Sequence, residues 1–392
     1  MKKYLFSPGP TMLPSEVQLK MAEPIMHHRE PEFSAIIAEI RENLKYLFQT
    51  KQEVLFFASS GTGAMDGAVS NLLSRGDTAL VVRGGKFGER WAEICEAYGV
   101  RVRSIDVPWG DAVDPGLVAD ILNGDESIRA VYVTASETST GVKHPIKTLG
   151  EITRDHEGSV LVVDAITGIG VFDLPMDAWG IDVMVTGSQK ALMLPPGLSF
   201  ASLSDKAWRA VERSDLPKYY FNFKKELGRL KKNDTSFTPA VTLMIGLRES
   251  LRMIRQEGLE ALFARHETLA GAVRAAVKAL GLGLYAEKSP SNAVTAVSVP
   301  EHVGAKELKS QFYERFGITV AGGQDRAKGK IIRIAHLGYY DRLDMIMVIS
   351  ALEMLLREMG HPFELGAGVR AAEEILIESP YRGRDSSSVA KG

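Results

Sequence analysis

Between residues 53 and 204, short apolar runs of strand length alternate with stretches of helical periodicity. The apolar runs lack a period of two, so each is expected to be buried on both faces of a sheet. We predict seven strands, at residues 54–58, 78–82, 102–107, 130–135, 160–164, 182–187 and 199–203. Intervening helices, such as 63–73 and 89–98, favour an α/β fold with a mostly parallel sheet. The functional groups of such sheets collect at the carboxyl ends of the strands.

After residue 204 the pattern changes to longer helices with fewer strands, an α+β arrangement that predicts a second, smaller domain. With 392 residues the chain exceeds the usual size of a single core. An amphipathic helix at 31–48 precedes the alternating region. We expect an N-terminal arm, a large domain, a small C-terminal domain and a disordered tail, at residues 1–14, 15–241, 242–383 and 384–392.

The composition restricts the kind of partner. Hydrophobic residues make up 45% of the chain, charged residues 24%, and the formal net charge is -2. This balance predicts small-molecule substrates, with no nucleic acid and no membrane as partner. No apolar run approaches the roughly 18 residues of a membrane span, and the single cysteine, Cys95, excludes an internal disulfide framework. A single cysteine fits a reducing compartment best, so we expect a cytoplasmic protein. We expect no metal site, because the adjacent His27 and His28 do not share a helix face.

Two polar features follow the predicted ends of strands. Lys190 comes after strand 182–187, in a segment closed by Pro195-Pro-Gly197. An isolated lysine is most often a solvated loop residue, but in a partly desolvated pocket it loses proton affinity and can form a Schiff base with a carbonyl. Ser60-Gly-Thr62 follows strand 54–58 and opens a helix. Its backbone N–H groups could hold a single phosphate, although the segment could also be a tight turn.

A third feature, Asp164, ends the strand 160–164. A carboxylate in this place could cap a helix, bind a ribose, or pair with a pyridinium nitrogen. Because the carboxyl ends of parallel strands meet at one edge of a sheet, Asp164, Lys190 and the Ser60-Gly-Thr62 segment would surround one ligand. In combination the three features favour pyridoxal 5'-phosphate (PLP), whose ring nitrogen, aldehyde and phosphate need these three kinds of partner.

The sequence resembles the class V aminotransferases of fold type I, in particular the alanine–glyoxylate, serine–glyoxylate and serine–pyruvate group. The resemblance extends over nearly the whole chain, and its most specific part is Gly187-Ser-Gln-Lys190 followed by Pro195-Pro-Gly197. Further matching motifs are Ser7-Pro-Gly-Pro10, His28-Arg-Glu-Pro-Glu-Phe33, Ser60-Gly-Thr62, Glu137-Thr-Ser-Thr-Gly141 and Arg333-Ile-Ala-His-Leu-Gly338.

The resemblance implies a PLP-dependent aminotransferase in which Lys190 carries the cofactor covalently and Asp164 pairs with its ring nitrogen. The implied phosphate ligands are Ser60, Gly61, Thr62 and Gln189, with Phe87 stacked on the ring and Thr138 at the ring oxygen. Arg333 would bind the substrate carboxylate, and Gly9, His28 and Arg29 would lie near the substrate. Thr238 would reach the phosphate of a partner subunit, which implies a homodimer with shared active sites.

Two positions depart from the family pattern. Thr235 replaces a frequent tyrosine three residues before Thr238, and Thr62 replaces a frequent histidine. The substrate is therefore open: alanine or serine with glyoxylate or pyruvate is favoured, and aspartate, ureidoglycine or an aminophosphonate are alternative donors. A PLP-dependent lyase that catalyses β-elimination and a noncatalytic subunit are further alternatives. A cysteine desulfurase is disfavoured, because Cys95 falls in a predicted helix and not in a mobile loop.

Overall fold

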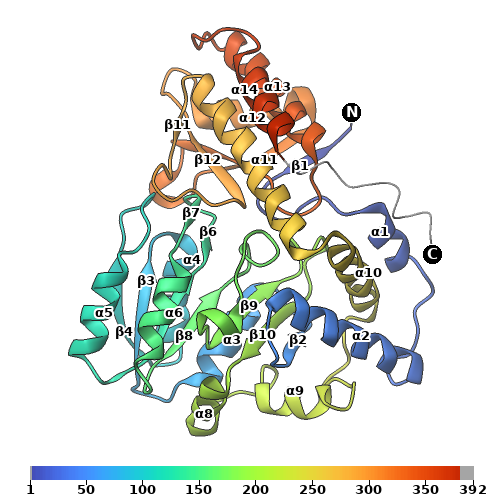
Figure 1. The fold of residues 1–392 in the computed structure, drawn as a ribbon, viewed down its shortest axis with the longest axis vertical. Helices are drawn as coiled ribbons and strands as arrows, with labels where there is room; N and C mark the ends of the chain where they lie inside the picture. Colours follow the sequence, from blue (N-terminus) through green and yellow to red (C-terminus); the bar gives the residue numbers. More distant parts are fainter. Residues whose placement is uncertain (1, 380–392) are drawn as a thin grey trace.

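The computed structural model describes residues 2–379 as two sheets with helices packed around them (Figure 1). The larger sheet has the strand order β2-β10-β9-β8-β5-β3-β4. Its strands are β2 (Val54–Phe57), β3 (Thr78–Arg83), β4 (Arg101–Asp106), β5 (Ile128–Thr134), β8 (Val160–Asp164), β9 (Val183–Gly187) and β10 (Ser199–Leu203). All pairs are parallel except those of β10, which is antiparallel to both β2 and β9. The predicted seven-stranded, mostly parallel sheet is confirmed.

The central strands explain why the sequence shows continuous apolar runs. Every residue of β8, β9 and β10 is buried, so neither face of these strands needs polar side chains. Helices α3 (Gly61–Leu72), α4 (Lys86–Ala97) and α6 (Ile146–Arg154) pack against the sheet, and α2 (Pro31–Phe48) buries the apolar stripe that its sequence predicts. Shorter helices complete this part: α5 (Pro115–Gly124), α7 (Met176–Trp179), α8 (Asp205–Arg213) and α9 (Phe223–Leu230).

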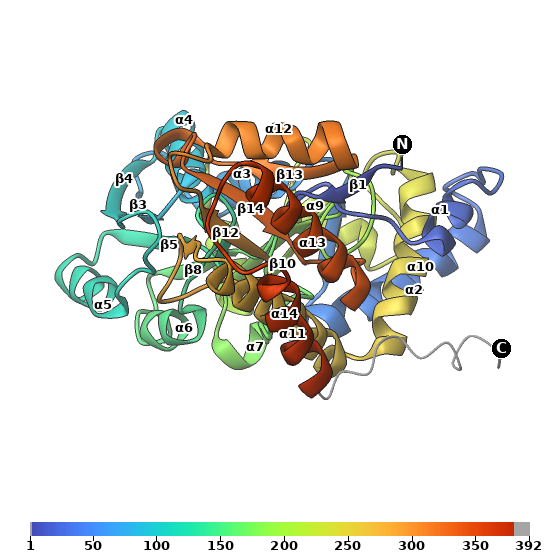
Figure 2. The same cartoon turned by 90° about the horizontal axis from the view of Figure 1, so that it is seen from above.

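The smaller sheet joins the N-terminal strand to strands from the last third of the chain. Its order is β1-β13-β14-β12-β11, formed by β1 (Tyr4–Phe6), β11 (Gly283–Leu284), β12 (Val294–Ser298), β13 (Ile318–Gly322) and β14 (Ile331–Ala335). Strand β1 runs parallel to β13, with Tyr4 opposite Ile318. The start of the predicted N-terminal arm is thus an ordered strand. Helices α11 (Leu259–Ala279), α13 (Arg342–Glu358) and α14 (Ala367–Glu378) lie side by side, and α12 (Ala305–Phe316) packs on β13 (Figure 2).

Helix α10 (Val241–Glu257) connects the two parts. It packs against α1 (Ser15–Met21) and α2, and its Met244 and Leu247 belong to the core of the larger sheet. The core of the smaller sheet includes α11 from Leu269 onward. Leu262 of α11 still belongs to the core of the larger sheet, so we propose that the packing changes from the large to the small domain within α11, between Leu262 and Leu269. The predicted tail at 384–392 lies outside the described residues, and no helix within residues 2–379 is long and apolar enough to cross a membrane.

The strand directions bring the predicted site together. Since β2 and β9 are both antiparallel to β10, they run in the same direction as β8. Their carboxyl ends, which lead to Ser60, Lys190 and Asp164, therefore lie at one edge of the sheet. Residue Arg333 reaches this edge from β14 of the smaller sheet.

We predict that Arg265→Ala lowers the free energy of unfolding by about 3–5 kcal/mol, because it breaks a buried charge pair. Arg265 is 0% exposed; it pairs with Glu257 at 2.5 Å and donates to the carbonyls of Gly338 and Tyr340. Urea unfolding measures the change. As a control, Arg209→Ala removes an exposed pair with Glu157 and should cost less than about 1 kcal/mol. Equal losses in both variants would contradict the prediction.

Candidate active site

Lys190 lies just after β9 and is in contact with the N-terminal arm. Its amine donates to the carbonyl of Pro8 at 2.6 Å, and the Thr11 hydroxyl donates to the Lys190 carbonyl at 3.1 Å. Gly9 lies against the same side chain: a Cβ at this position would fall 2.1 Å from Lys190 Nζ. Gly9, predicted to lie near the substrate, is thus in contact with the lysine, and only glycine fits there.

A closed loop holds Lys190 in place. The Ser188 hydroxyl donates to the Pro195 carbonyl at 2.7 Å and accepts from the Leu198 N–H at 3.1 Å, which closes the turn between β9 and β10. Burial lowers the pKa of Lys190 to about 8, with Arg333 and Arg90 acting in the same direction and Asp164 in the opposite one. A substantial fraction of the amine is therefore neutral near physiological pH, as a nucleophile or a proton acceptor must be.

The second predicted residue, Asp164, is the buried last residue of β8. One of its oxygens accepts from the Ile166 N–H at 2.8 Å. Burial raises the pKa of Asp164 to about 7, and the Glu137 carboxylate adds to this rise, while the Ile166 N–H, Arg90 and Lys190 oppose it. A cationic partner such as a pyridinium would stabilise the ionised form further.

The predicted phosphate ligands lie at the start of α3. Ser60 is the residue before the helix and its hydroxyl makes no capping bond. Ser60, Gly61 and Thr62 line the same cavity as the Gln189 side chain. Gly61 allows a close approach, because a Cβ there would lie 2.6 Å from Ile166 Cδ1. The Gln189 Oε1 atom is buried with no hydrogen-bond partner in the described chain. An amide oxygen only accepts, so this atom lacks a donor, whereas a phosphate would accept from the Nε2 group of the same side chain.

These residues surround one cavity of about 400 Å³ at the carboxyl edge of the large sheet. Eight of the predicted residues line it: Ser60, Gly61, Thr62, Phe87, Thr138, Asp164, Gln189 and Lys190. Its size suits a small-molecule cofactor. The donor set also fits PLP, because it offers a helix N-terminus for the phosphate, a carboxylate for the ring nitrogen and a lysine of lowered pKa for the aldehyde.

The cavity also includes residues that the sequence did not point to, namely Arg90, Ser136, Ile166 and Thr167. Ser136 and Thr167 are joined by the bond from the Thr167 hydroxyl to the Ser136 carbonyl, at 2.9 Å. Arg90 lies one helical turn after Phe87 on α4, a spacing that places the two side chains on the same helix face but does not by itself indicate a site.

A buried carboxylate, Glu137, fixes the two predicted ring contacts. It accepts from the backbone N–H groups of Phe87 and Gly88, each at 3.0 Å, and from the N–H and hydroxyl of Ser139. The acceptor thus lies at the N-terminus of α4, where a helix favours negative charge. The carboxylate binds the N–H of Phe87 itself and the N–H of Ser139, the residue after Thr138. These bonds fix the positions of Phe87 and Thr138 relative to each other before any ligand binds.

The predicted carboxylate ligand, Arg333, is buried on β14. Its Nη1 donates to the Thr138 carbonyl at 2.7 Å and its Nε to the Gly322 carbonyl at 3.0 Å. Burial lowers the pKa of Arg333 to about 10, so the guanidinium stays charged at neutral pH. Because its hydrogen bonds go to neutral carbonyls, the positive charge is available to a substrate carboxylate at the Thr138 end of the cavity.

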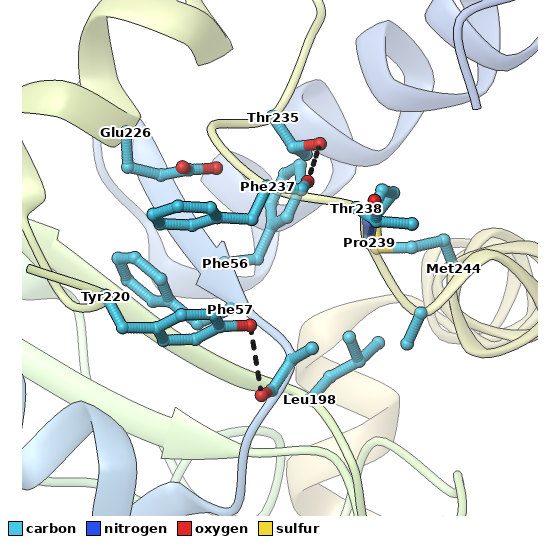
Figure 3. Close-up of a pocket in the computed structure, with 12 residues that line it drawn as sticks. Phe56, Phe57, Leu198, Tyr220, Glu226, Thr235, Phe237, Thr238, Pro239 and Met244 are labelled. Atoms are coloured by element: carbon cyan, nitrogen blue, oxygen red, sulfur yellow. Dashed lines mark hydrogen bonds between the residues drawn. The ribbon is translucent and has the colours of Figure 1, made fainter.

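Five predicted residues are not among those that line this cavity. Two of them, Gly9 and Arg333, contact the lining residues Lys190 and Thr138, and the other three lie elsewhere. Thr238 lies in a separate hollow beside β2 and α10, where the stacked rings of Tyr220 and Phe237 form one wall (Figure 3). His28 and Arg29 lie between α1 and α2, and Arg29 forms an ion pair with Asp234.

Comparison with known proteins identifies the relatives of the chain. The family described as "Aminotransferase class-V" matches residues 3–344. The "Soluble hydrogenase, small subunit" of Synechococcus sp. (strain PCC 6716) is 45% identical over 96% of this chain and 98% of that protein. A serine–glyoxylate aminotransferase of Hyphomicrobium methylovorum is 38% identical over 96% of this chain and 95% of its own length.

Among solved structures, the ureidoglycine–glyoxylate aminotransferase of Bacillus subtilis superposes with a TM-score of 0.90, at 28% identity. The match covers 96% of this chain and 98% of that one.

We predict that the cofactor-free protein captures PLP covalently at a rate that rises with pH and levels off above about 8, the pKa of Lys190. Only the neutral amine attacks a carbonyl, and the neutral fraction increases as the pH passes the pKa. Absorbance after mixing gives the rate, and borohydride reduction with mass spectrometry identifies the residue. The exposed Lys288→Ala should behave as wild type. A rate that still climbs toward about 10.4 would indicate a solvated lysine instead.

Proposed function

The chain belongs to the class V aminotransferases, and we propose that it transfers the amino group of alanine or serine to glyoxylate or pyruvate. Membership makes it a PLP-dependent enzyme that acts on amino acids and 2-oxo acids. The observation that supports the reaction most strongly is the placement of Lys190, of lowered pKa, and Asp164 in one cavity, with Arg333 bonded to the Thr138 carbonyl at its edge.

Each residue of the cavity has a distinct task. When bound, PLP supplies an electron-withdrawing ring that stabilises negative charge at the substrate α-carbon. Asp164 balances positive charge at the ring nitrogen, while Ser60, Gly61, Thr62 and Gln189 hold the phosphate. Phe87 and Thr138 fix the plane of the ring.

Arg333 and Lys190 act on the substrate. The Arg333 guanidinium binds the α-carboxylate and thereby orients the α-carbon. The Lys190 amine takes the proton from that carbon, for which a pKa of about 8 is well matched to neutral pH. The N-terminal arm covers the Lys190 amine on one side, through the Pro8 carbonyl.

The small cavity and the relatives support small substrates. The cavity must hold both the cofactor and the amino acid, and its lining residues lie close around the cofactor positions. Two of the relatives named above are described as using serine or ureidoglycine with glyoxylate, so between these two the acceptor recurs while the donor differs. Aspartate, ureidoglycine and aminophosphonates therefore remain alternative donors.

Cys95 bears on two other functions: cysteine desulfuration, and the hydrogenase activity for which the Synechococcus relative is named. It is the only cysteine of the chain, is buried in α4, and burial raises its pKa to about 12. A buried thiol of such high pKa does not act as the nucleophile of a desulfurase. A single thiol also cannot bind an iron–sulfur cluster, because such clusters are held by several cysteines. A reduced, buried cysteine agrees with the proposal of a cytoplasmic enzyme. β-Elimination, which needs no thiol, remains the rival reaction.

We further propose a homodimer in which Thr238 reaches the phosphate bound by the partner. The support is its position outside its own subunit's cavity, beside exposed aromatic rings: Tyr219 is 77% exposed and packs against Phe237. Arg29 pairs with Asp234 and approaches the Thr235 carbonyl. His28, Arg29 and the segment from Thr235 to Thr238 thus form one surface that a partner subunit would receive.

The proposed reaction predicts that Lys190→Ala lowers transamination by at least about 10³-fold, because nucleophile and base are lost together. A panel of alanine, serine and aspartate against glyoxylate and pyruvate identifies the pair with the highest kcat/KM. We expect alanine or serine with glyoxylate to lead. Full activity in Lys190→Ala would refute the assignment of the lysine.

Serine without an oxo acid separates transamination from β-elimination. A transaminase stops after each subunit has accepted one amino group, whereas a lyase forms pyruvate continuously. Multiple turnovers with serine alone would therefore overturn the aminotransferase proposal in favour of the lyase.

A mixed-subunit experiment tests whether sites are shared. Lys190→Ala and Thr238→Asp should each be inactive, the second because its carboxylate repels the phosphate. Co-expressed in equal amounts they should recover about one quarter of wild-type activity, because half of the dimers are mixed and each holds one intact site. If Thr238 served its own subunit, both sites of the mixed dimer would be defective and no activity would return.

A further inference from the structure

Arg90 is a cavity residue to which the proposed mechanism gives no task. It lies on α4, one turn after Phe87, and its guanidinium is 4.9 Å from the centre of the Phe87 ring. Its Nη1 donates to the Thr62 hydroxyl at 3.2 Å. The same side chain therefore touches a residue of the phosphate end and the residue that stacks on the ring.

The charge of Arg90 is not matched by a direct partner. Within residues 2–379 its guanidinium forms no ion pair, and its contacts are a hydroxyl and an aromatic face. Other arginines of the large domain, such as Arg41 and Arg83, pair with carboxylates. A cation that lines a partly buried cavity without a carboxylate next to it exerts its field on the groups that share the cavity.

The anionic group that shares the cavity with Arg90 is Asp164. Four charged groups influence one another here: Asp164 on β8, Lys190 after β9, Arg90 on α4 and Glu137 on β6 (Ser136–Glu137). Glu137 disfavours a second negative charge on Asp164, whereas Arg90 and Lys190 favour it. Arg90 keeps its charge whether or not Lys190 is bound covalently to a cofactor, because a guanidinium remains protonated.

We propose that Arg90 is a positioning residue that links Thr62 to Phe87 and holds negative charge on Asp164. This inference rests on the proposed role of Asp164 as the partner of the ring nitrogen. A guanidinium suits the task because it is always protonated and its plane can stack on a ring while its edge donates a hydrogen bond.

The test compares Arg90→Gln with two controls. Arg90→Lys keeps the charge. Arg83→Gln removes a partly exposed charge on β3, which is paired with Asp106 of β4. The titration of Asp164 is followed by carbon NMR of aspartate-labelled, cofactor-free protein, and Asp164→Asn assigns its signal. Arg90→Gln should move the titration to higher pH, because removal of a cation disfavours the carboxylate. Arg90→Lys and Arg83→Gln should stay close to wild type. An unmoved Asp164 signal in Arg90→Gln overturns the inference.

Cofactor affinity provides a second readout and separates two roles. If Arg90 acts through Asp164, Arg90→Gln should weaken PLP and pyridoxal binding equally, on the order of threefold to tenfold near pH 7. The loss should shrink toward pH 9, where Asp164 ionises without help. A loss confined to PLP would make Arg90 a phosphate ligand and overturn the proposal. Wild-type PLP affinity in Asp164→Asn would instead refute the assigned role of Asp164, while an unshifted Asp164 in Arg90→Gln leaves the proposed reaction intact.

Discussion

The burial of two opposite charges at one sheet edge is the constraint on which the site depends. Asp164 and Lys190 end up there because β8 and β9 are parallel neighbours, and both lose hydration when the strands pack. Desolvation raises the pKa of Asp164 and lowers the pKa of Lys190, so that both values lie close to neutral pH. The smaller sheet adds Arg333 and the arm adds Gly9, so chemistry arises from a place that the large sheet creates and the other parts enclose.

Much of this arrangement could be predicted because it depends on local patterns. The bounds of α2, β8 and β10 agree with the sequence pattern, since these elements have strong apolar periodicity or are buried completely. Glycines, hydroxyls, Asp164 and Lys190 could be placed in one cavity because parallel strands end together. Strand β13 was missed, because Gly322 and Gly323 interrupt its pattern, and β1 was not recognised as a strand because it has only three residues.

The contacts that could not be predicted come from residues far apart in sequence. Glu137 holds the start of α4, about 50 residues earlier in the chain, and no local pattern announces that bond. Arg90 looks like any solvated helix residue until α3 and α4 are packed side by side. Thr238 and Arg29 lie outside their own cavity, and a single sequence does not reveal which subunit a residue serves.

The N-terminal strand has a consequence for the order in which the protein is made. β1 pairs with β13, whose residues appear more than 300 positions later in the chain. Pro8 and Gly9 follow β1 directly and contact Lys190. The large sheet, whose last strand ends at Leu203, is synthesised before β13 and can therefore form while its lysine is still open to water. Pairing of β1 with β13 then fixes the segment that covers the reactive amine.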